Sequence, residues 1–213
     1  MVVTVLRLGH RYVRDDRVTT HLFLAARAFG ADSVVYSGQR DPDVEESVRK
    51  VNVTWGGFFE LSYAPNWVKV VNEHKDKSGR VVHLTMYGQQ LQTVVDDIRS
   101  SASDKLVIVG GSKVPREAYE LADWNVAVTS QPHSEISALS VFLHELFRGE
   151  ELHKAFSDGL LEIIPQPKGK KVNRCSPTVG SRFGARPLVS RSAYCNEGIR
   201  EAWSARAYAR AFR

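Results

Sequence analysis

The chain alternates between short apolar runs and longer amphipathic segments, and this alternation limits the folds open to it. Seven runs have the length and composition of β-strands: residues 2–8, 33–37, 58–63, 81–87, 106–111, 124–129 and 160–165. Several are unbroken stretches of Val, Ile and Leu, which suit strands covered on both faces. The pattern predicts an α/β fold with a mostly parallel sheet and helices on both faces.

The segments between these runs have helical periodicity. We expect helices over residues 19–29, 41–51, 89–99, 115–122 and 134–148. Thr19 or Thr20 is a candidate N-cap of the first helix, and Gly30 stands where glycine often follows a helix end. Ligands of such sheets bind beyond the carboxyl ends of the strands. Three of these ends are polar: residues 84–88, 110–114 and 129–135.

The charge of the chain is unevenly distributed. Its 213 residues carry a net charge of +5, but residues 173–213 alone contain eight Arg and two Glu. We therefore expect one domain over residues 1–172 and a basic C-terminal extension over 173–213. Ser, Gly, Pro and Arg dominate the extension up to residue 192 without apolar periodicity, which predicts disorder. Residues 197–213 could form a basic helix.

Several classes of protein are disfavoured. No run of 18 apolar residues exists, so we expect no membrane span, and the N-terminus reads as a strand rather than a signal peptide. Both cysteines, Cys175 and Cys195, lie in the extension, which argues against a zinc site and for an intracellular protein. His133 and Glu135 lack a second cluster with ligand spacing, so we expect no metal. No Gly-x-Ser-x-Gly elbow indicates a serine hydrolase.

Two motifs leave alternatives open. In LVIVGGSKVP, two glycines after a strand permit close approach of a ligand, but the motif also fits a plain strand–helix turn. The second motif is a cluster of four arginines within eleven residues: Arg7, Arg11, Arg14 and Arg17. They could hold phosphates, or form a charged loop paired with Asp15 and Asp16.

Four stretches together carry a more specific signal. They are LRLGHRYVRDDRVTTHLFLAARAFGAD (6–32), VVHLTMYG (81–88), IVGGSKVPREAYELADWNVAVTSQPHSEISALSVFLHEL (108–146) and IIPQPKGKKV (163–172). Together they resemble the archaeal tRNA ribose methyltransferases that modify cytidine-56 of the TΨC loop, in the SPOUT superfamily. The resemblance covers nearly all of residues 2–172. It implies S-adenosylmethionine as cofactor, tRNA as substrate, a C-terminal trefoil knot, a homodimer and a cytoplasmic location.

The resemblance also implies a cofactor site on the three polar strand ends. The implied cofactor-binding residues are Leu84, Gly110, Gly111, Ser112, Lys113, Val114, Val128, Thr129, Ser130, Gln131, Pro132, His133, Ser134 and Glu135. We expect backbone groups there to hold the cofactor. His133 and Glu135 then organise the site and do not act as acid and base.

The catalytic arginine is displaced relative to related ribose methyltransferases. Those enzymes use an arginine six residues before the helix-ending glycine to help remove the 2′-hydroxyl proton, and that position is Leu24 here. The resemblance therefore implies another arginine, Arg17 as first choice and Arg11 as second. Two alternatives stay open: a SPOUT methyltransferase that acts on another RNA position, and a catalytically inactive RNA-binding SPOUT protein.

Overall fold

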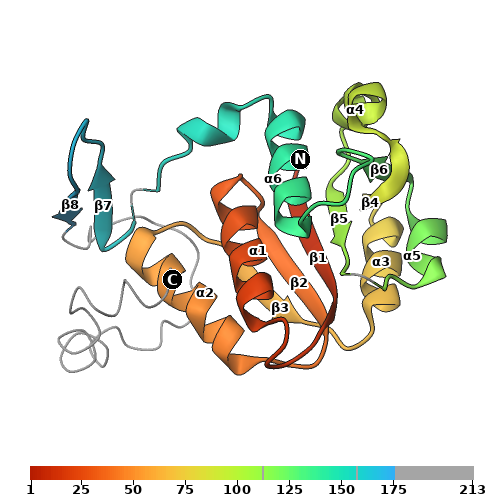
Figure 1. The fold of residues 1–213 in the computed structure, drawn as a ribbon, viewed down its shortest axis with the longest axis horizontal. Helices are drawn as coiled ribbons and strands as arrows, with labels where there is room; N and C mark the ends of the chain where they lie inside the picture. The colour runs from red at the N-terminus through yellow and green to blue at the C-terminus, as the bar shows by residue number, and fades with distance from the viewer. Residues whose placement is uncertain (112, 157, 176–213) are drawn as a thin grey trace. The chain divides into compact units, whose positions relative to one another are not determined.

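The computed structural model describes residues 1–111, 113–156 and 158–175. Six strands form one parallel sheet in the order β3-β2-β1-β5-β4-β6 (Figure 1). Their bounds are β1 Val3–His10, β2 Ser33–Gly38, β3 Glu60–Tyr63, β4 Arg80–Gln90, β5 Lys105–Val109 and β6 Trp124–Ala127. The central strands β1 and β5 are largely buried on both faces, which explains why apolar residues dominate both.

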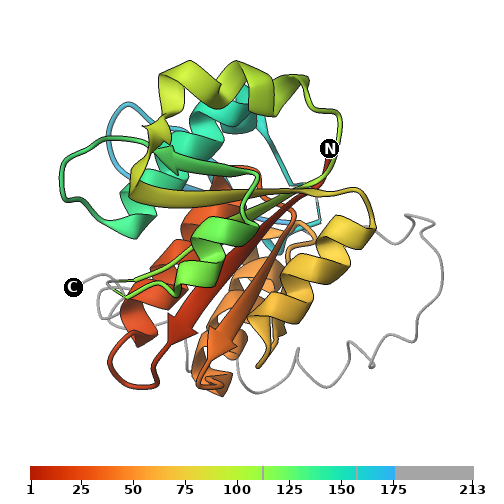
Figure 2. The same cartoon turned by 90° about the vertical axis from the view of Figure 1, so that its right-hand side faces the viewer.

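Helices cover both faces of this sheet, as predicted. Four pack with the larger core cluster on one face: α1 (Asp16–Ala28), α2 (Pro42–Trp55), α4 (Leu91–Ser100) and α6 (Glu135–Phe147). Two pack with the smaller cluster on the other face: α3 (Trp67–Asp76) and α5 (Arg116–Leu121). Figure 2 shows α3 and α5 together in front of the strands. Among the described helices, none is both long and apolar enough to cross a membrane.

The strand order creates a switch point in the middle of the sheet. β1 and β5 are neighbours, with Val3 opposite Lys105 and Arg7 opposite Val109. The helix that follows β1 packs on one face, whereas the helix that follows β5 packs on the other. The loops after these two strands therefore diverge at the carboxyl edge. In doubly wound sheets such a point is where ligands bind.

Strand β4 pairs twice with the same residue of β6. Leu84 and Gln89 both lie opposite Val126, so the residues between them bulge out of the ladder. Gly88 permits this path, because a Cβ there would lie 2.5 Å from backbone atoms of Asn125 and Val126. Tyr87, which lies within this bulge, is 81% exposed.

Several predicted elements differ from the structure. Helix α3 was not expected, although Asn66 caps it by accepting a hydrogen bond from Lys69 N. Helix α1 begins at Asp16, before either predicted cap, and Thr19 is instead buried inside it. Gly30 does follow the helix end, with a φ of 90°.

The last described residues form a separate hairpin. β7 (Leu161–Ile164) and β8 (Lys171–Arg174) pair antiparallel, outside the main sheet, so the seventh predicted strand exists but has a different partner. β8 continues past residue 172, where we expected the domain to end. Residues 176–213, including the helix expected over 197–213, lie outside the described residues. The trefoil knot stays a prediction.

Candidate functional site

The predicted cofactor-binding residues lie at three neighbouring strand ends. Leu84 ends the pairing of β4 with β5, where it stands opposite Val109. Gly110 follows β5 directly, and residues 128–135 connect β6 to α6. Because β5, β4 and β6 are consecutive in the sheet, their carboxyl ends share one edge. Ser112 lies outside the described residues.

The loop after β5 closes tightly on itself. A Cβ added to Gly110 would stand 2.2 Å from Cγ2 of Val114. A side chain at Gly110 would therefore displace that of Val114, so glycine lets Val114 pack against the start of the loop. This turn brings loop backbone close to the switch point between β1 and β5.

The loop after β6 is held by bonds to its own backbone. His133 donates from Nδ1 to the carbonyl of Gln131 at 2.7 Å, and Thr129 Oγ1 accepts from Gln131 N. Ser134 is the N-cap of α6, as its side chain accepts from Ile136 N. The side chains of Thr129, His133 and Ser134 thus shape a turn and a cap, and residues 129–134 are exposed at the carboxyl edge.

Arg7 is a candidate site residue that the sequence suggested only as one of four clustered arginines. Its side chain is 3% exposed, and its Nη2 forms an ion pair with Glu135 Oε1 at 3.2 Å. Its Nε and Nη1 have no hydrogen-bond partner within the described part of the chain. Burial lowers the pKa of Arg7, although the nearby carboxylates of Glu135 and Asp15 act in the opposite direction. One signal was present: Arg7 interrupts an apolar strand at a position that shares a face with Val3 and Val5.

Arg11 and Arg17, the predicted catalytic residues, have different surroundings. Arg11 forms a two-pronged ion pair with Asp15, through Nε to Oδ2 at 2.9 Å and Nη2 to Oδ1 at 3.1 Å. These hydrogen bonds raise the pKa of Arg11 and lower that of Asp15. Arg17 is exposed in the first turn of α1. Arg11 thus lies in the loop between β1 and α1, and Arg17 lies at the start of α1.

Buried hydrogen bonds of His10 hold the end of β1 to α1 and to the start of α2. His10 is fully buried; its Nδ1 lies 2.8 Å from Thr19 Oγ1 and its Nε2 lies 3.1 Å from Asp41 Oδ2. The other carboxylate oxygen of Asp41 caps α2 by accepting from Asp43 N and Val44 N. The loop between β1 and α1 is therefore anchored at both ends to the rigid part of the fold.

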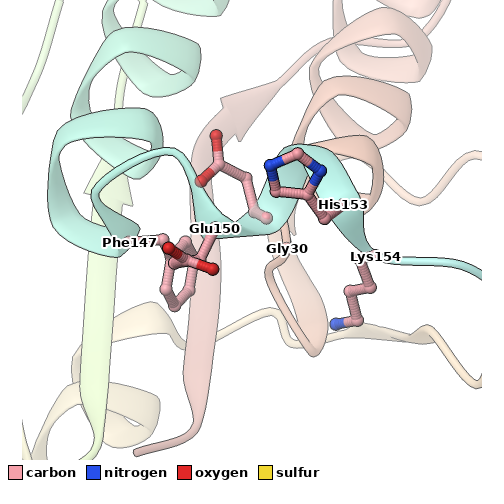
Figure 3. Close-up of a pocket in the computed structure, with 6 residues that line it drawn as sticks. Gly30, Phe147, Glu150, His153 and Lys154 are labelled. Carbon is pink, nitrogen blue, oxygen red and sulfur yellow. The ribbon is translucent and has the colours of Figure 1, made fainter.

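A shallow hollow of about 370 Å³ lies at the opposite edge of the sheet. Its lining residues are Gly30, Phe147, Glu150, Glu151, His153 and Lys154 (Figure 3). Gly30 precedes the amino end of β2, and Phe147 is the last residue of α6. The hollow is thus separated from the strand-end loops by the length of the sheet. Across the described ranges, no three His, Cys, Asp or Glu side chains gather as a metal site would need.

Comparison with known sequences identifies close relatives. A family model described as tRNA ribose 2'-O-methyltransferase, aTrm56, matches residues 55–173. A Methanosphaera stadtmanae protein named tRNA (cytidine(56)-2'-O)-methyltransferase is 50% identical over 171 residues, which are 80% of this chain and 98% of that protein. The protein of the same name from Methanocaldococcus jannaschii is 51% identical over 176 residues, 82% of this chain and 97% of that protein.

Solved structures share the fold at low sequence identity. The SpoU methyltransferase AviRb from Streptomyces viridochromogenes, in complex with AdoMet, aligns with a TM-score of 0.52 and 15% identity, over 70% of this chain and 58% of that chain. An rRNA methyltransferase from Sinorhizobium meliloti aligns with a TM-score of 0.54 and 20% identity, over 69% of this chain and 56% of that chain. This chain therefore spans little more than half the length of either solved protein. The sequence matches confirm the predicted resemblance: the chain belongs to the tRNA ribose 2'-O-methyltransferase family aTrm56.

Proposed function

We propose that this protein transfers the methyl group of S-adenosylmethionine to the ribose 2′-hydroxyl of cytidine-56 in tRNA. Relatives with about half of their residues identical have this activity in their name. The observation that carries the proposal is the convergence of the Gly110 turn, the β4 bulge and the β6–α6 loop on one edge of the sheet, beside the switch point.

The residues at this edge fit such a cofactor. S-adenosylmethionine supplies an activated methyl group when bound. The tight turn at Gly110 and the exposed loop over residues 129–134 offer backbone donors and acceptors, and Arg7 offers buried donors that require an acceptor. These loops would hold the cofactor in line with the attacking oxygen and exclude water.

The arginines after β1 are suited to act on the ribose. A 2′-hydroxyl is a weak nucleophile, so it needs help with its proton or with the negative charge that develops on oxygen. We assign this role to Arg17 first and to Arg11 second. Asp15 holds Arg11 in its charged form, which suits charge stabilisation better than proton transfer.

Two further properties belong to the proposal. The protein would act as a homodimer, in which a second copy completes the site next to the strand-end loops. It would be cytoplasmic, because its tRNA substrate is found there.

The activity is tested with purified protein, tritiated S-adenosylmethionine and an unmodified tRNA transcript. We expect label in the tRNA, and mass-spectrometric mapping should place it at nucleotide 56. A matched tRNA with 2′-deoxycytidine at that position should accept no label. Equal labelling of both tRNAs would reject the position. Failure to bind the cofactor would favour an RNA-binding protein without catalysis.

The assignment of Arg17 is tested by Arg17→Ala. We expect methyl transfer to be abolished while the dissociation constant of the cofactor, measured by isothermal titration, stays nearly unchanged. Arg14→Ala is a matched control, because Arg14 is exposed in the same segment. Full turnover by the Arg17 variant would overturn the assignment, and Arg11→Ala would then be tested in the same way.

A further inference from the structure

We propose that Arg7 and Glu135 form a subsite for the α-amino-acid end of S-adenosylmethionine, with the cofactor carboxylate on Arg7 and its ammonium group on Glu135. This inference rests on the function proposed above, because it requires that cofactor. It assigns a role to an ion pair that the transfer of the methyl group does not itself need.

The first observation is the state of the Arg7 guanidinium. It is 3% exposed, yet only its Nη2 has a partner, Glu135 Oε1 at 3.2 Å. Buried donors without acceptors are unfavourable, and an arginine has five N–H groups to satisfy. Nε and Nη1 are both without a partner in the described part of the chain. An oxygen acceptor that enters from the side of the Gly111 loop would satisfy Nη1, which faces that loop together with Nη2.

The second observation is the position of the guanidinium relative to those loops. A Cβ added to Gly111 would stand 3.7 Å from Nη2 and 3.9 Å from Nη1 of Arg7. A side chain at Gly111 would thus touch the guanidinium, and the glycine leaves that space uncovered. Arg7 is therefore next to a predicted cofactor loop, but too deeply buried for the phosphates of a folded RNA to reach.

The charges of the cofactor select its orientation. Its carboxylate is its one anionic group, while its sulfonium and ammonium groups are cations that a guanidinium repels. Arginine binds carboxylates through charge-assisted hydrogen bonds. The carboxylate is therefore the group that fits Arg7.

Glu135 supplies the complementary charge. Its side chain is 27% exposed in the first turn of α6, and only its Oε1 has a hydrogen-bond partner among the described residues. Its second oxygen can accept from an ammonium group. A cation and an anion that are held side by side match a zwitterion, whereas a simple anion or cation would be repelled by one of the two.

The test compares two ligands that differ in the amino-acid end. S-adenosylhomocysteine has it, and 5′-methylthioadenosine lacks it. For full-length Arg7→Gln and Glu135→Gln, isothermal titration should give about ten- to a hundredfold weaker binding of the first ligand, as expected for removal of a charged hydrogen bond. The dissociation constant of the second ligand, measured in the same way, should change less than about threefold.

A matched variant controls for the removal of a buried arginine. Arg27 is also buried, and it donates from Nη2 to the carbonyl of Gly56 near the far end of α1. Arg27→Gln should leave the affinities of both ligands unchanged. If Arg7→Gln fails to fold, Arg7→Lys and the more exposed Glu135→Gln provide the comparison.

Each other outcome has a definite meaning. Equal weakening of both ligands would show that the pair only shapes the loops, and unchanged binding of both would show that it does not contact the cofactor. Either result would overturn the subsite and leave the proposed function standing. If the wild-type protein binds neither ligand, the cofactor itself is wrong and both proposals fail.

Discussion

At the scale of residues, two arginines four positions apart have opposite environments. Burial lowers the pKa of Arg7, whereas hydrogen bonds to Asp15 raise the pKa of Arg11. The Arg7 side chain is buried and paired with Glu135, whereas that of Arg11 is 47% exposed. The two side chains therefore suit different partners: Arg7 a small buried ligand, and Arg11 a large one that approaches from solvent.

The Arg11–Asp15 pair predicts a specific acid dependence. The lowered pKa of Asp15 stabilises the fold above the unfolded value of about 3.9, and this contribution is lost as the pH falls through the folded value. Arg11→Gln should therefore reduce the free energy of unfolding at pH 7 by a small amount, since solvent screens a pair whose arginine is half exposed. The difference from wild type should shrink as the pH falls below the unfolded value and through the lowered folded pKa of Asp15. Urea denaturation between pH 3 and 7 measures it, with Arg14→Gln as control; a difference independent of pH would contradict it.

At the scale of elements, the sequence predicted the central features and missed those set by tertiary contacts. The strands predicted near β1 and β5 were confirmed, because strands that are buried on both faces consist mostly of apolar residues. The start of α1 was wrong because the Thr19 hydroxyl bonds His10 instead of capping the helix. Helix α3 was missed, and Val71 is its one fully buried residue.

The site was predictable from the sequence only where a local pattern marks it. The three polar strand ends were visible because polar residues directly follow apolar runs. The pairing of Arg7 with Glu135 was not, because 128 residues separate them and no local pattern links the two. Whether the predicted residues bind the cofactor stays a prediction.

His83 links β4, β6 and α5 and predicts a dependence on pH near neutrality. Its Nδ1 lies 2.8 Å from Asn125 Oδ1, and its ring packs edge-on against Tyr119. Burial lowers its pKa, so protonation favours the unfolded chain. The free energy of unfolding should fall as the pH drops below the unfolded pKa of about 6.5, by up to about 1.4 kcal/mol per pH unit until the folded pKa is reached.

The matched variant for this prediction is His83→Gln, which removes the titrating ring. Its free energy of unfolding should change less between pH 7 and 5 than that of the wild type. His153→Gln is the control, because His153 is exposed in the 3₁₀ helix Glu150–His153. If the free energy of unfolding fell equally with pH in the wild type and in His83→Gln, His83 would not account for the loss of stability.

At the scale of the whole molecule, the excess of positive charge is concentrated at one end of the sequence. Residues 176–213 contain seven Arg and two Glu, so the remaining 175 residues have 22 basic and 22 acidic side chains. Binding to tRNA through neutralised phosphates releases counterions and weakens with salt. The C-terminal segment is thus the part of the chain whose net charge favours tRNA.

Truncation after Cys175 tests this contribution. We expect the truncated protein to bind S-adenosylhomocysteine like the wild type, because the strand-end loops are unchanged. Its tRNA affinity should depend less steeply on salt. The slope of the logarithm of the binding constant against the logarithm of the salt concentration should be smaller in magnitude by about 0.7–0.9 for each phosphate that the segment neutralises in the full-length protein. Binding measured across a range of salt concentrations gives the slope, and identical slopes would mean that the segment neutralises no phosphates.

The position of β1 at the centre of the sheet has a consequence for synthesis. β1 is made before both of its neighbours, and it can pair with β2 early, but its other neighbour is β5, with Lys105 opposite Val3. At about 5–20 residues per second, a ribosome needs roughly 5–20 s to reach that partner. During this interval one edge of an apolar strand is open to pairing with other chains. The delay between these two strands, rather than the time needed to make the whole protein, sets how long the nascent chain is at risk of aggregation.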